Sequence, residues 1–420
     1  MLKNLKPKHQ FKIEGSIVRV RIVDSILTFS SIHHVKKLWL QIFWIVFLGI
    51  LSAIFGVLIV ENTGLYDIGL SAFSQGIGRI AFYFIYEKTQ NEPLAYGVFN
   101  GLFWGLYLIF NIPLVIFGWF KIGKRFTLLS ILYICVSTFG GFIFAFIHNI
   151  NKLYLLGDLS LNKVPYLADH NVQLVFWNYK FDAQKHFSVF IYGILWGLFQ
   201  AVVYAVLLII DCSTGGLDFP AVWYGESRYK DIGIGLAVIN IISLIISYII
   251  GSFIPASFAL IKIQSNPAYL SVIELETKNG LVLTLARLNT NPWSVNLFFS
   301  PNFLSSLLMN LLLSLLLNVL FPKTQMVKVE IYSAKADEIC DVLISENKPY
   351  SLSINYVKGG YSKNIQKILI INCVFMEAAK LLQLVRNHDE NALFVVSLLK
   401  KIDGYIFMPK KNHPFKKSRH

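Results

Sequence analysis

Charged residues are scarce in this sequence. Asp, Glu, Lys and Arg make up 15% of its 420 residues, whereas they make up about a quarter of an ordinary soluble protein. Hydrophobic residues amount to 55%, and apolar runs long enough to cross a bilayer recur along the chain. The sequence therefore excludes an ordinary soluble protein and predicts a mainly α-helical membrane protein.

Cysteine is rare, and the motifs of common catalytic and metal sites are absent. No C-x-x-C pair occurs among the 4 cysteines, Cys135, Cys212, Cys340 and Cys373, and those on the cytoplasmic side should be reduced. The sequence contains no Walker A loop, no H-E-x-x-H or G-x-S-x-G motif and no Cys/His metal spacing. We therefore expect no enzyme, no cofactor and no metal. An ATP-driven system would need its ATPase on another polypeptide.

Positive charge predominates, with 38 Lys and Arg against 24 Asp and Glu. The basic residues flank the apolar runs and gather towards the C-terminus, and no RNA- or DNA-binding signature accompanies them. This distribution argues against nucleic acid as a partner and favours the anionic membrane surface. The basic tail 409–420 either binds lipid of the inner leaflet or is a disordered end.

Six apolar runs have the length and composition of membrane spans. They lie near 38–60, 97–119, 126–148, 187–210, 231–254 and 302–320. A further apolar stretch, 64–85, contains Asp67, Gln75 and Arg79. Because polar and charged side chains are expensive in lipid, we predict a re-entrant or interfacial piece there rather than a full span.

The charge of the connecting segments predicts the orientation in the membrane. Segment 1–37 carries eight Lys and Arg and segment 120–125 carries three, whereas the longer segments 149–186 and 255–301 carry four and three. Cytoplasmic loops are enriched in Lys and Arg. Six spans with both termini in the cytoplasm fit this distribution, so we expect a multi-pass protein of the cell membrane.

Two polar breaks follow long apolar helices and precede others. The first lies at Asp67–Ala72 and the second at Asp211–Asp218. The next apolar helix after each break carries an asparagine, Asn111 and then Asn240. Three spans per half would give two inverted repeats, which is a transporter architecture with its site near the repeat interface. The other interpretation is a coincidental similarity between two glycine-rich hairpins.

A solute site is expected first at these breaks, because lipid tolerates irregular backbone only where protein or a water-filled cavity surrounds it. Asp67 and Asp218 could bind a cation or the amine of a solute. The asparagines could instead join helices by hydrogen bonds, and the glycines could serve close packing alone. The solute-binding candidates are Ser213, Thr214, Gly215, Gly216, Asp218, Asp67, Gly69, Ser71, Asn111 and Asn240.

Two insertions interrupt the membrane part on its outer side. In the insertion 149–186, we expect Asp169 and His170 to form a solvated loop pair rather than a metal site. The insertion 255–301 contains two alternating runs on either side of an Asn-Gly pair, which predicts a β-hairpin.

A change of pattern after Pro322 indicates a separate C-terminal domain. The expected order of elements is β-α-β-β-α-β, which is typical of an α+β ferredoxin-like fold. The predicted domains are a basic segment 1–37, a first membrane repeat 38–148, an extracellular insertion 149–186, a second membrane repeat 187–321 with the extracellular hairpin 255–301, a cytoplasmic domain 322–408 and the tail 409–420.

One loop of this domain could bind a regulatory ligand. Its candidate residues are Lys358, Gly359, Gly360, Tyr361 and Lys363. Glycines that allow positive φ and expose amides can form a nest for an anion, and the lysines would add charge. The alternative is a hairpin tip that needs glycine for turn geometry alone.

The chain resembles the YitT-type membrane protein family over most of residues 40–408, outside the insertions. The second break keeps the family pattern Ser-Thr-Gly-Gly-x-Asp at Ser213–Asp218. Further similar segments are Asn111–Leu114, Gly118-Trp119, Gly123–Phe126, Lys358–Tyr361 and Phe394–Ser397. At the first break the family's Asp-Gly-Gly-x-Thr-Gly is Asp67–Ala72 here, with two glycines lost.

This resemblance implies a cytoplasmic domain of PII-like, ferredoxin-like type. Such domains commonly trimerise and bind small regulatory ligands between subunits. The favoured hypothesis is a small-solute transporter or permease regulated by a cytoplasmic domain that senses an anionic metabolite. It rests on the paired breaks, the inverted halves and the polar residues at the breaks. The resemblance makes a homo-oligomer, and a trimer in particular, the expected assembly. The second hypothesis is a membrane-anchored sensor or scaffold without transport activity.

Overall fold

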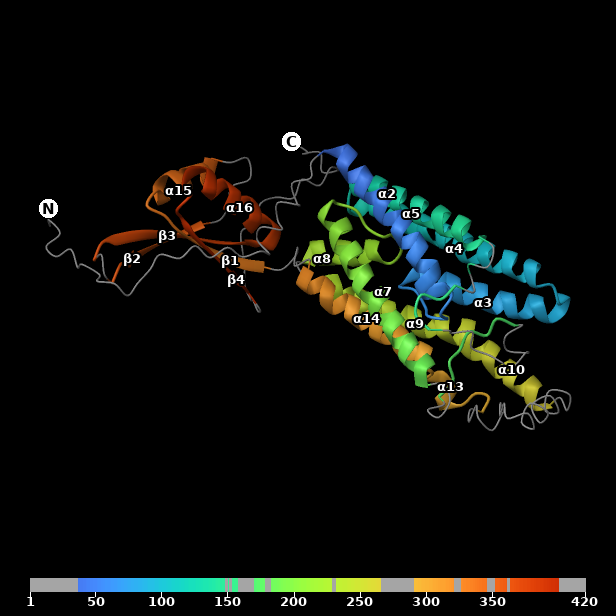
Figure 1. The fold of residues 1–420 in the computed structure, drawn as a ribbon. Helices are drawn as coiled ribbons and strands as arrows, with labels where there is room; N and C mark the ends of the chain where they lie inside the picture. Colours follow the sequence, from blue (N-terminus) through green and yellow to red (C-terminus); the bar gives the residue numbers. More distant parts are fainter. Residues whose placement is uncertain are drawn as a thin grey trace, which may run out of the picture. The chain divides into compact units, whose positions relative to one another are not determined.

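The computed structural model describes residues 37–147, 150, 153–157, 170–177, 183–228, 232–265, 291–320, 326–345, 352–360 and 363–399. These residues form two compact units (Figure 1). A helical unit lies within Lys36–Ser227 and Asp231–Phe321, and a C-terminal unit lies within Pro322–His420. The predicted hairpin of residues 271–286 lies outside the described residues.

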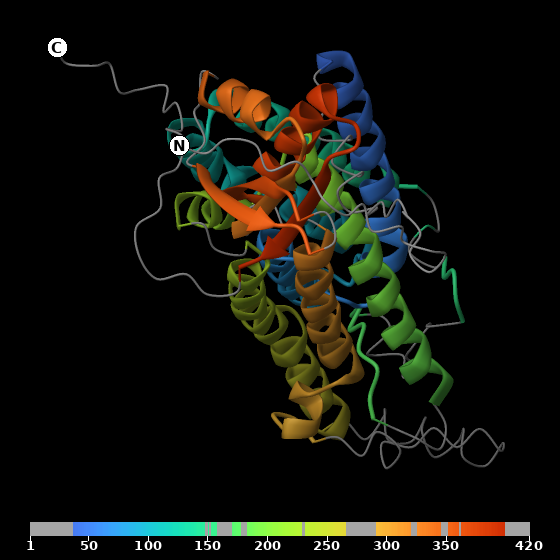
Figure 2. The same ribbon diagram turned by 90° about the vertical axis from the view of Figure 1, so that its left-hand side faces the viewer.

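Long apolar helices make up the helical unit. Its elements are α2 (Leu38–Phe55), the π-helical turn η2 (Gly56–Glu61), α3 (Leu70–Thr89), α4 (Glu92–Lys121), α5 (Lys124–Ala145), α7 (Ala183–Ile209), α8 (Asp218–Arg228), α9 (Ile232–Tyr248), the π-helical turn η4 (Ile249–Phe253), α10 (Ile254–Ser265), α13 (Val295–Phe298) and α14 (Pro301–Leu320). Helix α14 packs along both α7 and α9 (Figure 2).

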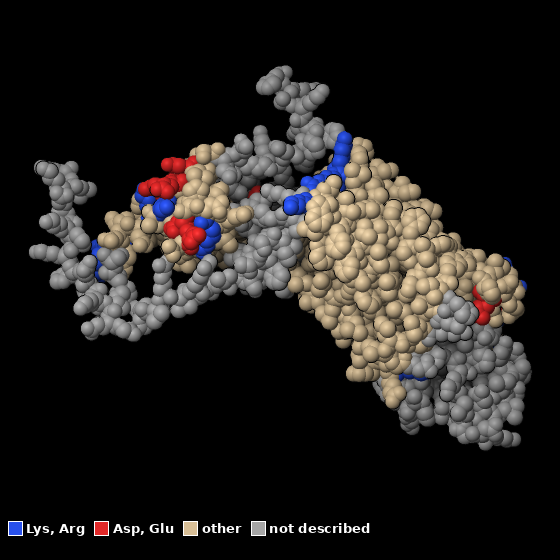
Figure 3. Space-filling view, turned by 45° about the horizontal axis from the view of Figure 1, so that its top comes forward, with Lys and Arg blue, Asp and Glu red and all other residues tan. Residues whose placement is uncertain are grey.

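Five of the described helices are long and apolar enough to cross a membrane: Leu38–Glu61, Glu92–Lys121, Lys124–Ala145, Gln184–Ile209 and Gly235–Ser265. The sixth predicted span is the shorter apolar helix Pro301–Leu317. The face of the helical unit in Figure 3 is almost free of charged side chains. Apolar side chains such as Phe120 and Leu315 are each 67% exposed, as expected for a surface that faces lipid. The protein is therefore rich in membrane helices.

Segment 64–85 is irregular only at its start. The chain is non-helical from Asn62 to Gly69, and α3 then continues as a helix of 20 residues. Gln75 and Arg79 are buried because their side chains turn back and donate hydrogen bonds to the carbonyl oxygens of Gly64 and Leu65. Gln75 and Arg79, two of the polar residues that argued against a full membrane span, therefore serve the irregular backbone before α3.

Helix α3 and turn η4 approach closely at two glycines. A Cβ on Gly251 would lie 2.6 Å from the Cα of Gly76, and a Cβ on Gly76 would lie 2.7 Å from the carbonyl oxygen of Ser247. Contacts this short with backbone atoms leave no room for a side chain. The two glycines thus permit a crossing between helices that are far apart in the sequence.

The C-terminal unit is a four-stranded antiparallel sheet with two helices. Its elements are β1 (Met326–Tyr332), α15 (Ala336–Ser345), β2 (Leu352–Lys358), β3 (Ile365–Val374), α16 (Phe375–His388) and β4 (Leu393–Leu398). The strand order is β2-β3-β1-β4. Val327, Val329 and Ile331 alternate with half-buried residues and pack against Ile339 and Leu381 of the two helices. The unit therefore has its own hydrophobic core.

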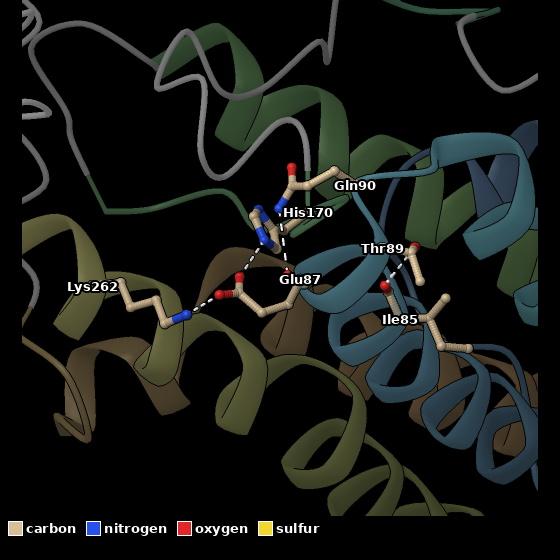
Figure 4. Close-up of polar contacts among 6 residues, drawn as sticks. All are labelled: Ile85, Glu87, Thr89, Gln90, His170 and Lys262. Carbon is tan, nitrogen blue, oxygen red and sulfur yellow. Dashed lines mark hydrogen bonds and ion pairs between the residues drawn. The ribbon is translucent and has the colours of Figure 1, made fainter.

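A polar cluster joins α3, α10 and the segment around His170 (Figure 4). One carboxylate oxygen of Glu87 lies 2.7 Å from Nε2 of His170, and the other accepts a hydrogen bond from Lys262. The side chain of His170 is buried against the rings of Tyr83 and Tyr86. The expectation of a solvated His170 was wrong, because the fold buries this side chain against aromatic rings and beside Glu87, a carboxylate distant in the sequence.

The crossing at Gly76 and Gly251 predicts that Gly251→Ala destabilises the helical unit by roughly 1–3 kcal/mol, the usual cost of overpacking. Gly97→Ala in α4 is the matched control, because a Cβ there meets nothing within 4 Å. Thermal unfolding of the two variants in detergent compares them. Equal melting temperatures would show that the two backbones do not meet at Gly251.

The turn after α16 predicts that the stability of the C-terminal unit depends on pH. Ser333 donates a 2.5 Å hydrogen bond to Asp389, and the amide of Asn391 donates a second of 2.9 Å. These bonds, the first above all, hold the pKa of Asp389 below its usual value. Their stabilisation is present above the unfolded pKa of about 4 and is lost as pH falls through the lower folded pKa.

Asp389→Asn should therefore lower the melting temperature of the C-terminal unit at pH 7, and the difference from wild type should shrink below about pH 4. Glu390→Gln at the neighbouring exposed position is the control and should change little. A difference that stays constant down to pH 2 would contradict the role of the Asp389 carboxylate.

Candidate functional site

The two breaks of the helical unit line one cavity of about 80 Å³. Other walls come from α2, η2, α3, α4, α5 and α7. For clarity, Leu38–Ala145 is called the first half and Ala183–Leu320 the second half. The cavity thus lies where irregular backbone from both halves meets.

The second break ends in a buried carboxylate with three hydroxyl partners. Tyr204 donates to one oxygen of Asp218 at 3.0 Å, Ser213 donates to the other at 3.2 Å, and Thr214 also donates to it. Gly215 and Gly216 have φ of 96° and 61°, a region that residues with a Cβ rarely adopt. The glycines thus bend the chain so that Asp218 begins α8 beside the hydroxyls that precede it.

Side chains of the first half hold the backbone of the second break. Asn111 accepts a 2.6 Å hydrogen bond from the amide of Gly216, and Tyr107, one turn earlier in α4, donates to the carbonyl oxygen of Thr214 at 3.0 Å. Ser130 of α5 accepts from the amide of Ser213 at 2.9 Å. The polar backbone groups of this break are therefore satisfied by protein, as an apolar surrounding requires.

The first break is held by the second half in a similar way. Trp196 of α7 donates to Asp67 at 3.1 Å, and Ser71 also donates to this carboxylate. Ser243 of α9 donates to the carbonyl oxygen of Gly69 at 2.5 Å. Asn240 lies beside the same glycine, since a Cβ on Gly69 would be 3.1 Å from its Oδ1. Each asparagine therefore packs against the break of the other half.

The structure brings most predicted site residues together. The candidates that line the cavity are Asp67, Gly69, Ser71, Thr214, Gly215, Gly216 and Asp218. Ser213, which belongs to the second break, and Asn111 and Asn240, which lie beside the breaks, are buried but are not among the lining residues. Ser213 and Asn111 hold the backbone of the second break by hydrogen bonds to the amides of Gly215 and Gly216.

Several lining residues were not predicted from the sequence. The most important are Glu61, Trp104, Tyr107, Trp196, Gln200 and Tyr204. A signal existed for Glu61, which is the one acidic residue within the first span, Leu38–Glu61, because an ionisable residue at membrane depth points to function. The aromatic residues gave no such signal, since apolar helices are rich in them.

The predicted regulatory loop lies in the C-terminal unit, as the connection between β2 and β3. The amide of Gly359 donates to the carbonyl oxygen of Asn364, and the amide of Lys363 donates to the carbonyl oxygen of Gly359, both at 2.9 Å. Positive φ occurs at Lys363 rather than at Gly360. The hairpin itself therefore uses two of these amides. Lys358 ends β2, and Tyr361 lies outside the described residues.

The contact between Asn111 and Gly216 predicts that Asn111→Leu lowers stability by roughly 1–3 kcal/mol, because it leaves a buried amide without an acceptor. Asn100, equally buried in the same helix, is the control. Its Oδ1 has no partner among the described residues, so Asn100→Leu should cost less. Thermal unfolding in detergent measures both, and the reverse order would contradict the anchoring of the break.

Comparison with known proteins places the chain among relatives of similar length. A family model described as "Uncharacterized protein conserved in bacteria (DUF2179)" matches residues 350–404, so a DUF2179 domain lies at the C-terminus. No solved structure matches the chain. The "Uncharacterized protein MG432" of Mycoplasma genitalium is 38% identical over 405 residues, which cover 96% of each chain.

Two further relatives agree with this placement. The MG432 homolog of Mycoplasma pneumoniae is 36% identical over 402 residues, covering 94% of this chain and 93% of its own. The "Uncharacterized protein MG443" of Mycoplasma genitalium is 29% identical over 409 residues, covering 96% and 97%. Since identity above 30% extends over nearly the whole of both MG432 proteins, the chain belongs to the MG432 family.

Proposed function

We propose that this protein is a small-solute transporter or permease of the cell membrane. One observation carries the proposal: two breaks in apolar helices meet around a single cavity inside the helical unit. Irregular backbone at membrane depth is expected where a solute or ion passes, and discontinuous helices supply the site in many transporters.

The arrangement of helices supports two related halves. The first half has α2, a break and then α3, α4 and α5. The second half has α7, a break and then α8, the span formed by α9, η4 and α10, the short α13, and α14. The first and last helices of each half pack together, α2 on α5 and α7 on α14. The reciprocal contacts of Asn111 and Asn240 fit inverted repeats related across the cavity.

The C-terminal unit would sense a ligand and regulate transport. Its strand order and element order fit a ferredoxin-like fold, and its DUF2179 match supports the YitT-type resemblance. With the N- and C-termini in the cytoplasm, an anionic metabolite would bind the loop from Lys358 to Lys363, in a homo-oligomer such as a trimer. The alternative function, a membrane-anchored sensor without transport, requires only this ligand binding by the C-terminal unit.

Transport can be tested in proteoliposomes on a solid-supported membrane, by screening small solutes for currents. A solute that gives a current with wild type should give at least about tenfold less with Asp218→Ala, which removes the acceptor of three hydroxyl groups. Gly216→Leu, which puts a side chain into the cavity wall, should have the same effect. Gly97→Ala should keep the wild-type current.

Full transport by a folded Gly216→Leu or Asp218→Ala variant would show that the breaks are not part of the transport site. Circular dichroism and size-exclusion chromatography in detergent distinguish an inactive variant from an unfolded one. If wild type transports nothing while its C-terminal unit binds an anionic metabolite, the sensor hypothesis replaces the transporter.

A further inference from the structure

The carboxylates at the two breaks are already compensated by the protein. Asp218 is the first residue of α8, and Asp67 lies just before α3. The N-terminus of a helix carries partial positive charge, which an acidic residue there neutralises. Hydroxyl and indole groups then donate to their oxygens. These two residues therefore complete the helix ends, and little of their charge is left for a ligand.

Glu61 differs from both of them. It is the last residue of η2, it lines the cavity, and its buried Oε2 has no hydrogen-bond partner in the part of the chain that the structure describes. Arg79 acts on Glu61 electrostatically, but no hydrogen bond or ion pair joins them among the described residues. Its guanidinium donates to the carbonyl oxygens of Gly64 and Leu65 and stacks on the ring of Tyr66. None of the described residues that line the cavity is Lys, Arg or His.

Gln200 supplies a second and independent observation. This α7 side chain lines the cavity, is only 7% exposed, and its Oε1 has no partner among the described residues. Buried polar atoms in proteins are nearly always hydrogen-bonded, so an exception at a cavity wall points to a ligand. Trp104 also lines the cavity and has an unpartnered donor, Nε1, among the described residues. The two unpartnered oxygens of Glu61 and Gln200 are acceptors, so a ligand that satisfies them carries N–H or O–H donors.

Aromatic rings and size narrow the chemistry of that ligand. Trp104, Tyr107, Trp196 and Tyr204 are among the lining residues, and such rings attract organic cations through their faces. The described carboxylates form no group of three that could hold a metal ion. The volume of about 80 Å³ is smaller than the roughly 150 Å³ of a cavity that binds benzene. The ligand therefore has few heavy atoms.

We propose that the cavity binds a small ammonium-type cation, such as a primary amine in its protonated form, with Glu61 as its counter-ion and Gln200 as a hydrogen-bond acceptor. The inference rests on the proposed function, since it names the substrate class of the same cavity. In this proposal, residues of η2 and α7 recognise the solute, and the two breaks shape the cavity around it.

The test uses the purified full-length protein in detergent, with methylammonium chloride as the probe and thermal unfolding as the measurement. Methylammonium should raise the melting temperature by a few degrees above the effect of potassium chloride or sodium acetate at equal concentration. Glu61→Gln should weaken the apparent affinity at least about tenfold, because it removes the counter-ion. Gln200→Met should weaken it as well. Glu92→Gln, an exposed acidic position in α4, is the control and should keep the shift.

Several results would overturn the proposal. A shift with acetate would make the cavity an anion site, an equal shift with potassium would make it an alkali-ion site, and no shift would leave no cation site at all. An unchanged shift with methylammonium in folded Glu61→Gln would show that Glu61 is not the counter-ion. If Glu61→Gln does not fold, an unchanged shift in Gln200→Met overturns the proposal instead.

Uptake of methylammonium into proteoliposomes separates this inference from the proposed function. Binding that depends on Glu61, without uptake of any solute, keeps the cation site and overturns the transporter. Uptake of a neutral or anionic solute that Glu61→Gln leaves unchanged keeps the transporter and overturns the cation site.

Discussion

The helical unit depends on the satisfaction of backbone polar groups where helices stop among apolar neighbours. An unpaired amide or carbonyl costs several kcal/mol in hydrocarbon, so a break can persist only where side chains supply partners. Some of these partners come from the same half, as Gln75 does for Asp67. Others come from the opposite half: Asn111 accepts from Gly216, and Ser243 donates to Gly69. This exchange fixes how the halves meet, and the cavity is the space that remains between the two breaks.

The two breaks are not equivalent. In the second, Gly215 and Gly216 both have positive φ, and a Cβ on Gly216 would be 3.2 Å from the Cβ of Leu70 in the first half. In the first, only Gly69 keeps this backbone conformation next to the cavity, and Ile68 is a buried apolar residue of the core. The second break therefore relies on two glycines in the positive-φ region, whereas the first relies on one beside the cavity.

The sequence predicted those parts of the site that depend on residues close to one another in the chain. The glycines and acids at the breaks and the asparagine after each break could be recognised from the sequence, and the structure places them side by side. Trp196 and Gln200 could not, because the sequence of an apolar helix does not show which of its faces meets a cavity. Glu61 did carry a signal, as the one acidic residue of its span, but it was not among the predicted site residues. The prediction for His170 was wrong for another reason, because its partner Glu87 lies 83 residues away in the sequence.

By itself, the sequence determined where apolar helices run, where they break, and that a small α+β unit follows them, because these features depend on composition and on the periodicity of neighbouring residues. Only the tertiary structure decided which polar group meets which. The decisive hydrogen bonds span 105 residues from Asn111 to Gly216 and 174 from Ser243 to Gly69. Such pairs are set by the packing of whole helices against one another, and no local pattern records that packing.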